Sequence, residues 1–197
     1  MKISIICEGK TEKAFKPHLI AFLQTRLQGS MPSLDFFPRA GAIPTDQKLQ
    51  RVVSTLLDTG SDAVIALTDV YPAFADAEEA KRKMREWVGT EPRFYTHVAL
   101  HDFEAWLLPH WDRIEKLAGR KSKAFGAHPE KVDLGNPPAH RLASLFEAGT
   151  CRDSYSKPRD ADRILKGANL MVSIDACPEL KAFVNTILKL CGAQEIA

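Results

Sequence analysis

Apolar positions follow two alternating patterns in the first half of the chain. Short, continuously apolar runs typical of buried strands occupy residues 2–7, 34–38, 63–68 and 94–100. Between these runs, apolar residues recur at helical spacing over residues 11–27, 46–57 and 76–88. Strands that alternate with helices predict a parallel sheet with helices on both faces. We therefore expect residues 1–100 to form an α/β core around a roughly four-stranded parallel sheet.

The pattern changes in the second half of the chain. Residues 103–108 begin a helical pattern, and two further helices are predicted over residues 139–147 and 178–190. Residues 119–138 are rich in Lys, Gly, Pro and His, which favours a loop. We expect residues 101–197 to be a helical extension that packs on the core, so that the chain forms a single compact unit.

Length and composition exclude several classes of protein. The 197 residues are 45% hydrophobic and 26% charged, which suffices for a buried core and argues against a disordered tail or a fibre. No apolar run approaches the roughly 20 residues that cross a bilayer, and no signal-peptide pattern is present. The four cysteines are scattered without a C-x-x-C pair and are expected to be reduced thiols. We expect a cytoplasmic protein that does not contact a membrane.

Charge adds one weak indication of a partner. The net charge is only +2, but residues 113–166 carry twelve Lys or Arg and seven Asp or Glu. A basic appendage beside an acidic body suits a metal site that also attracts phosphate. A solvated surface of mixed charge explains the same counts without any ligand.

Acidic residues follow three of the four predicted strands. Glu8 ends the first strand and Glu12 lies in the next helical turn, Asp69 ends the third strand, and Glu104 follows the fourth. Because the carboxyl ends of parallel strands meet at one edge of a sheet, we expect these side chains to converge. Converging carboxylates repel one another unless a cation neutralises them, and oxygen ligands suit Mg²⁺ or Mn²⁺. Such cations serve phosphodiester chemistry by activating water.

Two of these acidic residues, Glu12 and Asp69, also have a structural interpretation, whereas Glu8 at the mouth of a buried strand is harder to explain structurally. Glu12 is favoured at a helix start by capping and by the helix dipole, and Asp69 could form a turn before Pro72. If residues 101–106 are helical, His101 and Glu104 are i,i+3 neighbours on one face, although a histidine at a strand end is often structural.

Three tryptophans fit helix packing better than base stacking: Trp87, Trp106 and Trp111. The chain contains no P-loop, G-x-G-x-x-G or G-x-S-x-G motif.

The order of these motifs resembles a known family. Glu8 to Glu12 after a strand, with Asp69 after a later one, resembles the Toprim domain of topoisomerases, bacterial primases and OLD-family nucleases. A fuller resemblance is to a bacterial family of unknown function with a Toprim-like core, often encoded beside ABC-type ATPases. That family carries the motifs E-G-x-T-E, D-Y-Y, H-E-F-E-A-L, P-S-K-R-L, Y-x-K and C-P-x-F. The corresponding segments here are residues 8–12, 69–71, 101–106, 138–142, 155–157 and 177–178.

The resemblance implies a Toprim-like, Rossmann-like fold and a Mg²⁺-dependent phosphodiesterase, most simply a nuclease in phage defence or DNA processing. Glu8, Asp69 and Glu104 are then expected to hold the metal, with Glu12 as a further ligand or as the base that orients water. His101 is expected to assist proton transfer. The phosphate is expected to contact three basic residues: Lys10, Arg141 and Lys157. The expected partners are nucleic acid, either DNA or RNA, and an ABC-type ATPase.

Three departures from the family pattern keep a second function open. Tyr71 stands where Toprim enzymes carry a second aspartate, and Asp102 replaces a longer glutamate. Ala139 and His140 replace the serine and lysine of the P-S-K motif. The alternative is a non-catalytic Toprim-like module that binds a partner ATPase or nucleic acid.

Overall fold

The protein contains one parallel sheet of four strands. A computed structural model describes residues 1–39, 41–124, 128–132, 135–151 and 154–197. Within them the strands pair in the order β2-β1-β3-β4, and all three pairings are parallel. The bounds are β1 Lys2–Cys7, β2 Ser33–Pro38, β3 Ala63–Asp69 and β4 Phe94–Ala99. The four predicted strands are confirmed.

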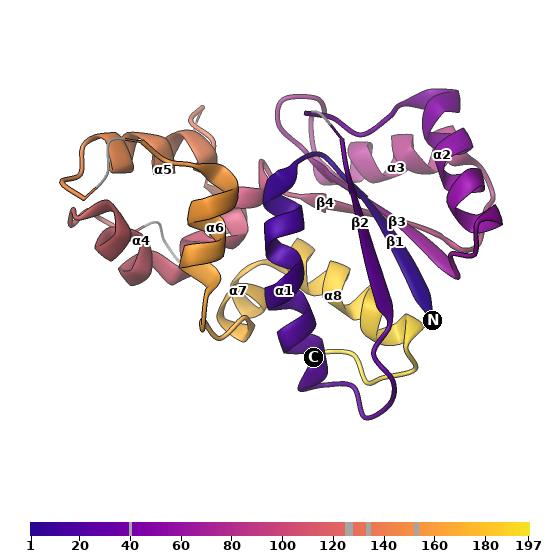
Figure 1. The fold of residues 1–197 in the computed structure, drawn as a ribbon. Helices are drawn as coiled ribbons and strands as arrows, with labels where there is room; N and C mark the ends of the chain where they lie inside the picture. The colour runs from indigo at the N-terminus through magenta and orange to yellow at the C-terminus, as the bar shows by residue number, and fades with distance from the viewer. Residues whose placement is uncertain (40, 125–127, 133–134, 152–153) are drawn as a thin grey trace.

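Helices cover both faces of the sheet (Figure 1). The helices α2, Asp46–Asp58, and α3, Ala77–Val88, lie on one face, while α1, Lys10–Gln24, and α8, Pro178–Leu190, lie on the other. Side chains of successive strand residues point to opposite faces, so Ile3 and Ile5 join the core beneath α1 and Ile6 joins the core beneath α2 and α3. The predicted α/β architecture is therefore confirmed.

The second half of the chain is helical, but it is divided more finely than expected. The predicted helices over 139–147 and 178–190 are confirmed as α5, Pro138–Glu147, and α8. Between and before them lie η1 Phe103–Trp106, η2 Leu108–His110, α4 Trp111–Ala118, η3 Pro129–Lys131, α6 Lys157–Leu165 and α7 Met171–Ala176. The predicted loop over 119–138 contains η3, and its residues 125–127 and 133–134 lie outside the described residues.

Two of these differences have clear physical causes. Residues 103–110 contain two 3₁₀ helices instead of the start of one α-helix, because Pro109 lacks an N–H and its ring would clash with the carbonyl group four residues earlier. The pattern also missed α4, α6 and α7, which have only six to nine residues each. A helix of two turns is too short for its apolar stripe to stand out, and tertiary packing stabilises it instead.

The larger hydrophobic core contains side chains from both halves of the chain. Phe15 of α1 packs against Phe103 and Trp106, with ring centroids 5.6 and 6.0 Å apart, and Trp106 stacks on Phe183 of α8 at 6.1 Å. Trp106 is therefore a packing residue. His18 of α1 also contacts Asp162 of α6 at 2.9 Å. These contacts hold the helical segment at the carboxyl edge of the sheet, while a domain boundary at residue 100 stays a prediction.

No helix in the described ranges combines the length and apolar character needed to cross a membrane.

Gly149 is expected to be the glycine least tolerant of a side chain. A Cβ atom at this position would overlap the Ala118 carbonyl oxygen at the end of α4 and come within 3.3 Å of the Leu145 carbonyl oxygen. Both obstacles are backbone, so Gly149→Ala should lower the free energy of unfolding by about 2 kcal/mol in urea denaturation. Gly29→Ala is the matched control, since nothing lies within 4 Å of its added atom. Equal stabilities of the two variants would contradict this packing.

Candidate active site

A cavity of about 580 Å³ lies at the carboxyl edge of the sheet. Segments that follow all four strands line it, with Arg39 after β2, Glu8 after β1, Asp69 at the end of β3, and residues 102–104 after β4. The first residues of α1 and α6 and the start of α5 complete the wall. This is the edge at which open α/β sheets bind their ligands.

Most of the predicted site residues meet in this cavity. The residues that line it include Glu8, Lys10, Glu12, Asp69, Glu104 and Lys157. The carboxyl ends of β1 and β3 are neighbours in the sheet, which brings Glu8 next to Asp69 as the sequence predicts.

His101 and Arg141 do not belong to the described residues that line the cavity. His101 has a left-handed backbone with φ 70°, and its carbonyl accepts a hydrogen bond of 2.8 Å from the Tyr71 amide. It therefore precedes η1 and is not part of a helix, so the predicted i,i+3 arrangement with Glu104 is wrong. The Nε of Arg141 donates to the Asn136 carbonyl at 2.8 Å, which holds its guanidinium against the turn before α5.

Glu8 is fixed by the neighbouring strand. Its Oε1 accepts hydrogen bonds from the Thr68 hydroxyl and, at 2.9 Å, from the Asp69 amide. Burial raises the pKa of the Glu8 carboxyl, although these two hydrogen bonds oppose the shift. The carboxylate is thus held in place beside Asp69, with its second oxygen free of these contacts.

Glu12 has the structural role that its position predicts. Its Oε1 accepts hydrogen bonds from the amides of Glu8 and Gly9 at 3.2 and 3.3 Å, as in a capping box at the start of α1. The side chain is buried, and burial raises its pKa. A cap of this kind also places the carboxylate at the cavity, so both interpretations of Glu12 describe the same conformation.

Asp69 lies at the centre of an acidic cluster. Burial raises the pKa of its carboxyl well above the usual range, and repulsion from Glu8, Glu12, Glu104 and Asp102 raises it further. We call these five residues the carboxylate cluster. Since each member disfavours the ionisation of Asp69, the cluster is a place of high negative potential.

Asp102 is a member of the carboxylate cluster that the sequence pattern did not single out as a ligand. The residue is 5% exposed, and its Oδ2 accepts a hydrogen bond of 3.0 Å from the Ala139 amide at the start of α5. Its Oδ1 is buried and has no hydrogen-bond partner among the described residues. A buried carboxylate oxygen without a donor is costly and calls for a counter-charge.

Lys157 supplies the main positive charge at the cluster. Its Nζ lies 3.3 Å from Oε2 of the fully buried Glu104, whose Oε1 lies 3.4 Å from the Tyr155 hydroxyl. Burial raises the pKa of Glu104 to about 7, against the opposing effect of Lys157. Burial alone would lower the pKa of Lys157, but Glu104, Asp102 and Asp69 raise it overall, so the lysine stays charged.

The cavity fits a hard divalent cation in its chemistry. All the acidic donors are carboxylate oxygens, and one of them, Oδ1 of Asp102, is buried without a partner among the described residues. No three Asp, Glu, His or Cys side chains in the described part of the chain are already arranged as a metal-binding group. The carboxylates of the described residues are therefore not preorganised as a metal site, and one of them, Glu104, is paired with Lys157.

A family model covers most of the chain. Residues 7–188 match the model described as domain of unknown function (DUF4276). The chain belongs to the DUF4276 family. Comparison with curated proteins found no match.

Two solved structures share the fold of this DUF4276 member. The C-terminal region of the Burkholderia pseudomallei OLD protein is similar with a TM-score of 0.57 and 16% identity, covering 96% of this chain and 98% of that one. The C-terminal region of the Xanthomonas campestris pv. campestris OLD protein gives a TM-score of 0.52 and 14% identity, with coverages of 96% and 95%. The likeness spans both the sheet and the helical extension, so it establishes the fold of the whole chain.

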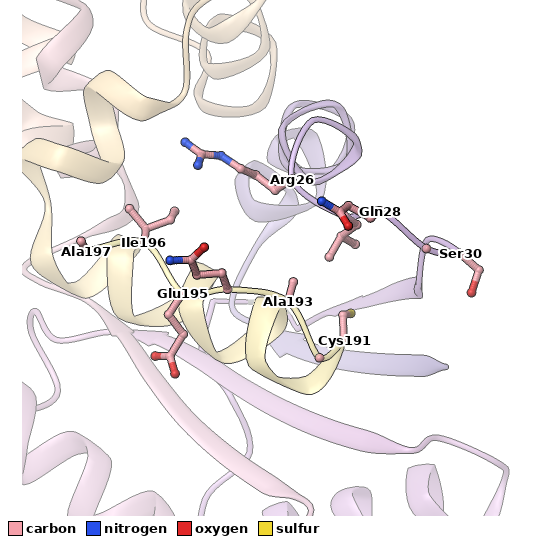
Figure 2. Close-up of a pocket in the computed structure, with 12 residues that line it drawn as sticks. Arg26, Gln28, Ser30, Cys191, Ala193, Glu195, Ile196 and Ala197 are labelled. Atoms are coloured by element: carbon pink, nitrogen blue, oxygen red, sulfur yellow. The ribbon is translucent and has the colours of Figure 1, made fainter.

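A larger cavity of about 720 Å³ in this DUF4276 member lies between the end of α1 and the segment after α8 (Figure 2). Arg26, Gln28 and Ser30 line one side of it, and residues 191–197 line the other. Glu195 is the one acidic side chain among the described residues that line it. Without a group of titratable side chains, this cavity offers less chemistry than the smaller one at the sheet edge.

Sequence reasoning missed several residues of the sheet-edge cavity. Arg39, Asp102 and His140 line it, and Thr68 and Tyr155 hydrogen-bond to its carboxylates. Arg39 directly follows β2, so the rule that located Glu8 and Asp69 at strand ends could also have located it. Tyr155 belongs to the Y-x-K motif of residues 155–157, but nothing in that motif indicates that its hydroxyl reaches Glu104.

Proposed function

We propose that this DUF4276 chain is a Mg²⁺- or Mn²⁺-dependent phosphodiesterase, a nuclease with a Toprim-like core. The observation that carries the proposal is the carboxylate cluster, whose five acidic residues line one cavity at the carboxyl edge of the sheet. Its structural likeness to the C-terminal region of OLD proteins and the E-G-x-T-E motif support the Toprim relationship.

In this proposal the residues have separate tasks. Glu8, Asp69 and Glu104 would hold the cation, supported by Oδ1 of Asp102, which has no hydrogen-bond partner among the described residues. The bound cation would activate water and stabilise the leaving oxygen of the phosphodiester. Glu12, held at the cavity by its capping contacts, orients the attacking water.

Lys157 changes partner in this scheme. With Glu104 among the residues that would hold the cation, Lys157 would be released from its present partner and could bind a phosphate oxygen. Lys10 also lines the cavity and provides a second positively charged side chain that can bind phosphate. His101 and Arg141 have no catalytic or phosphate-binding role in this proposal, since neither is among the described residues that line the cavity.

The family resemblance extends the proposal to a biological setting. We infer a cytoplasmic protein that acts on DNA or RNA in a defence or DNA-processing system, together with an ABC-type ATPase. The alternative function is a non-catalytic module that binds the ATPase or nucleic acid. Two observations favour that alternative, namely Tyr71 in place of a second aspartate and the ion pair that Lys157 makes with Glu104.

Calorimetric titration with Mn²⁺ tests the proposal without requiring a partner or a substrate. Wild type should bind Mn²⁺ saturably, and Glu8→Gln should weaken binding at least about 10-fold, because even groups that only support a ligand contribute 10- to 100-fold to affinity. Glu147→Gln, the same change at the exposed end of α5, is the control and should bind as wild type does. If wild type takes up no Mn²⁺, the catalytic proposal fails and the binding module replaces it.

A further inference from the structure

Tyr71 is unusual among the aromatic residues of this protein. It is 45% exposed, and the other large apolar residues of comparable exposure in the described ranges are Met1 and Val172. Tyr71 lies two residues after Asp69 and lines the same cavity as the carboxylate cluster. A flat, exposed ring is thus available within the proposed active site.

Apolar and acidic residues together line the cavity. Pro72, Pro137 and Pro158 line it along with Tyr71 and the carboxylate cluster. A bare phosphate or a free cation gains nothing from the apolar residues. A ligand with a flat, weakly polar part attached to an anionic part gains from both sets of residues, and a nucleotide has this composition.

Arg39 provides an anion-binding group on the other side of the cluster. Its amide donates to the Cys7 carbonyl at 2.8 Å, which fixes the residue beside the end of β1, and its side chain lines the cavity. The Nε of Arg39 is buried and has no hydrogen-bond partner among the described residues. A guanidinium nitrogen that has no other acceptor can donate a hydrogen bond to a phosphate oxygen.

The strand order places Arg39 and Tyr71 on opposite sides of Glu8. Arg39 follows β2, Glu8 follows the central β1, and Tyr71 follows β3. Adjacent strands lie about 4.8 Å apart, so the two residues are separated by about 10 Å along the sheet edge. A ligand that reaches both residues therefore has to cross the carboxylate cluster, as a polynucleotide segment with a base at one end and a phosphate at the other can do.

We propose that this site binds an unpaired segment of a polynucleotide, an inference that rests on the proposed function. One base of the segment stacks on Tyr71, and Arg39 holds the phosphate next to the scissile one. Within a duplex, neighbouring bases cover both faces of each base, so no face remains for the tyrosine ring. An unpaired segment exposes its bases and can follow the sheet edge from β2 to β3. The substrate class is therefore single-stranded nucleic acid or an unpaired end.

Fluorescence anisotropy with labelled 12-nucleotide probes tests this inference. The probes are single-stranded DNA, single-stranded RNA and a blunt DNA duplex, each with Ca²⁺ in place of Mg²⁺. Wild type should bind a single strand at least about 10-fold more tightly than the duplex, and the DNA and RNA probes identify the preferred sugar. Tyr71→Ala should remove about 10-fold of that affinity, while Tyr71→Phe should retain it because the ring is kept.

Arg39→Gln and Val172→Ala complete the set of variants. Arg39→Gln should weaken single-strand binding and reduce the slope of log affinity against log salt by about 0.7, the change expected for one lost phosphate contact on a single strand. Val172→Ala removes an exposed apolar side chain outside the cavity and should bind as wild type does. Equal binding of duplex and single strand, no binding of either, or unchanged binding by Tyr71→Ala would overturn the inference.

The result is separable from the test of the proposed function. If Mn²⁺ titration fails but Tyr71-dependent binding of single strands is found, catalysis is refuted and recognition stands. The opposite result is that Mn²⁺ binds at Glu8, while wild type and Tyr71→Ala each cleave duplex and single strands at the same rate. That result refutes only the recognition of an unpaired segment.

Discussion

Asp69→Asn is expected to lower cation-dependent cleavage of nucleic acid at least about 100-fold. Asp69 is the central member of the carboxylate cluster, where repulsion from Glu8 and Glu12 adds to burial in raising its pKa. In the proposed function its carboxylate is a direct ligand of the cation, and groups that only support such ligands already contribute 10- to 100-fold. The measurement is the initial rate on oligonucleotides with saturating Mg²⁺ or Mn²⁺.

Asp58→Asn is the matched control for that experiment. It makes the same chemical change at the exposed end of α2, outside the residues that line the cavity, and should cleave at the wild-type rate. Asparagine keeps the shape of Asp69 and removes a repelled charge, so the variant should fold at least as well as wild type without metal. Full cleavage by Asp69→Asn would contradict the assignment of the site.

The second large effect is a pH-dependent stabilisation by Glu104→Gln in the presence of EDTA. Burial raises the pKa of Glu104 to about 7 in the folded protein. The folded state therefore holds this proton more tightly than the unfolded chain does, and stability is lost as pH rises from the unfolded value toward 7. Between pH 5 and pH 8 the free energy of unfolding of Glu104→Gln should rise by about 2–3 kcal/mol relative to wild type.

The comparison with wild type is essential because other groups titrate in the same range. Burial lowers the pKa of His97 to about 4 and also lowers the pKa of His110. These histidines make the fold more stable as pH rises, and their contribution cancels when the variant is compared with wild type at each pH. Urea denaturation at pH 5 and pH 8 gives the difference, with Glu147→Gln as control. A difference that does not change with pH would show that Glu104 titrates normally.

The positions of three cluster members were predictable because parallel strands impose a simple geometry. A buried apolar run followed directly by an acidic residue identified Glu8 and Asp69, and the topology of alternating strands and helices placed both at one edge of the sheet. Glu104 was located by the same reasoning, although the helix that it was expected to begin is two short 3₁₀ helices. The periodic pattern also predicted α5 and α8, in which the apolar stripe is long enough to be distinct.

The contacts of the basic residues were not predictable in this way. Arg141 satisfies the backbone of a nearby turn, and Lys157 pairs with Glu104, fifty-three residues away, at the start of a helix that the pattern did not reveal. A long basic side chain can reach several partners from one backbone position. The partner that it contacts therefore depends on which distant segments of the chain pack beside it. Arg39 and Asp102 also line the cavity. Both follow strands, so the edge rule could have located them, but not the contacts that their side chains make.

The layered α/β architecture could be predicted from the amino-acid sequence, because buried strands and amphipathic helices have different periods of apolar residues. The acidic residues at the strand ends could also be predicted, because parallel strands end at the same edge of the sheet. Which charged side chains contact one another depends on the tertiary structure. Packing of α5 and α6 over the sheet edge buries Glu104 and Asp102, brings Lys157 to them, and leaves the ring of Tyr71 exposed at the same cavity. Burial and electrostatic repulsion act over distances of a few ångströms in space, and no local pattern of residues encodes those distances.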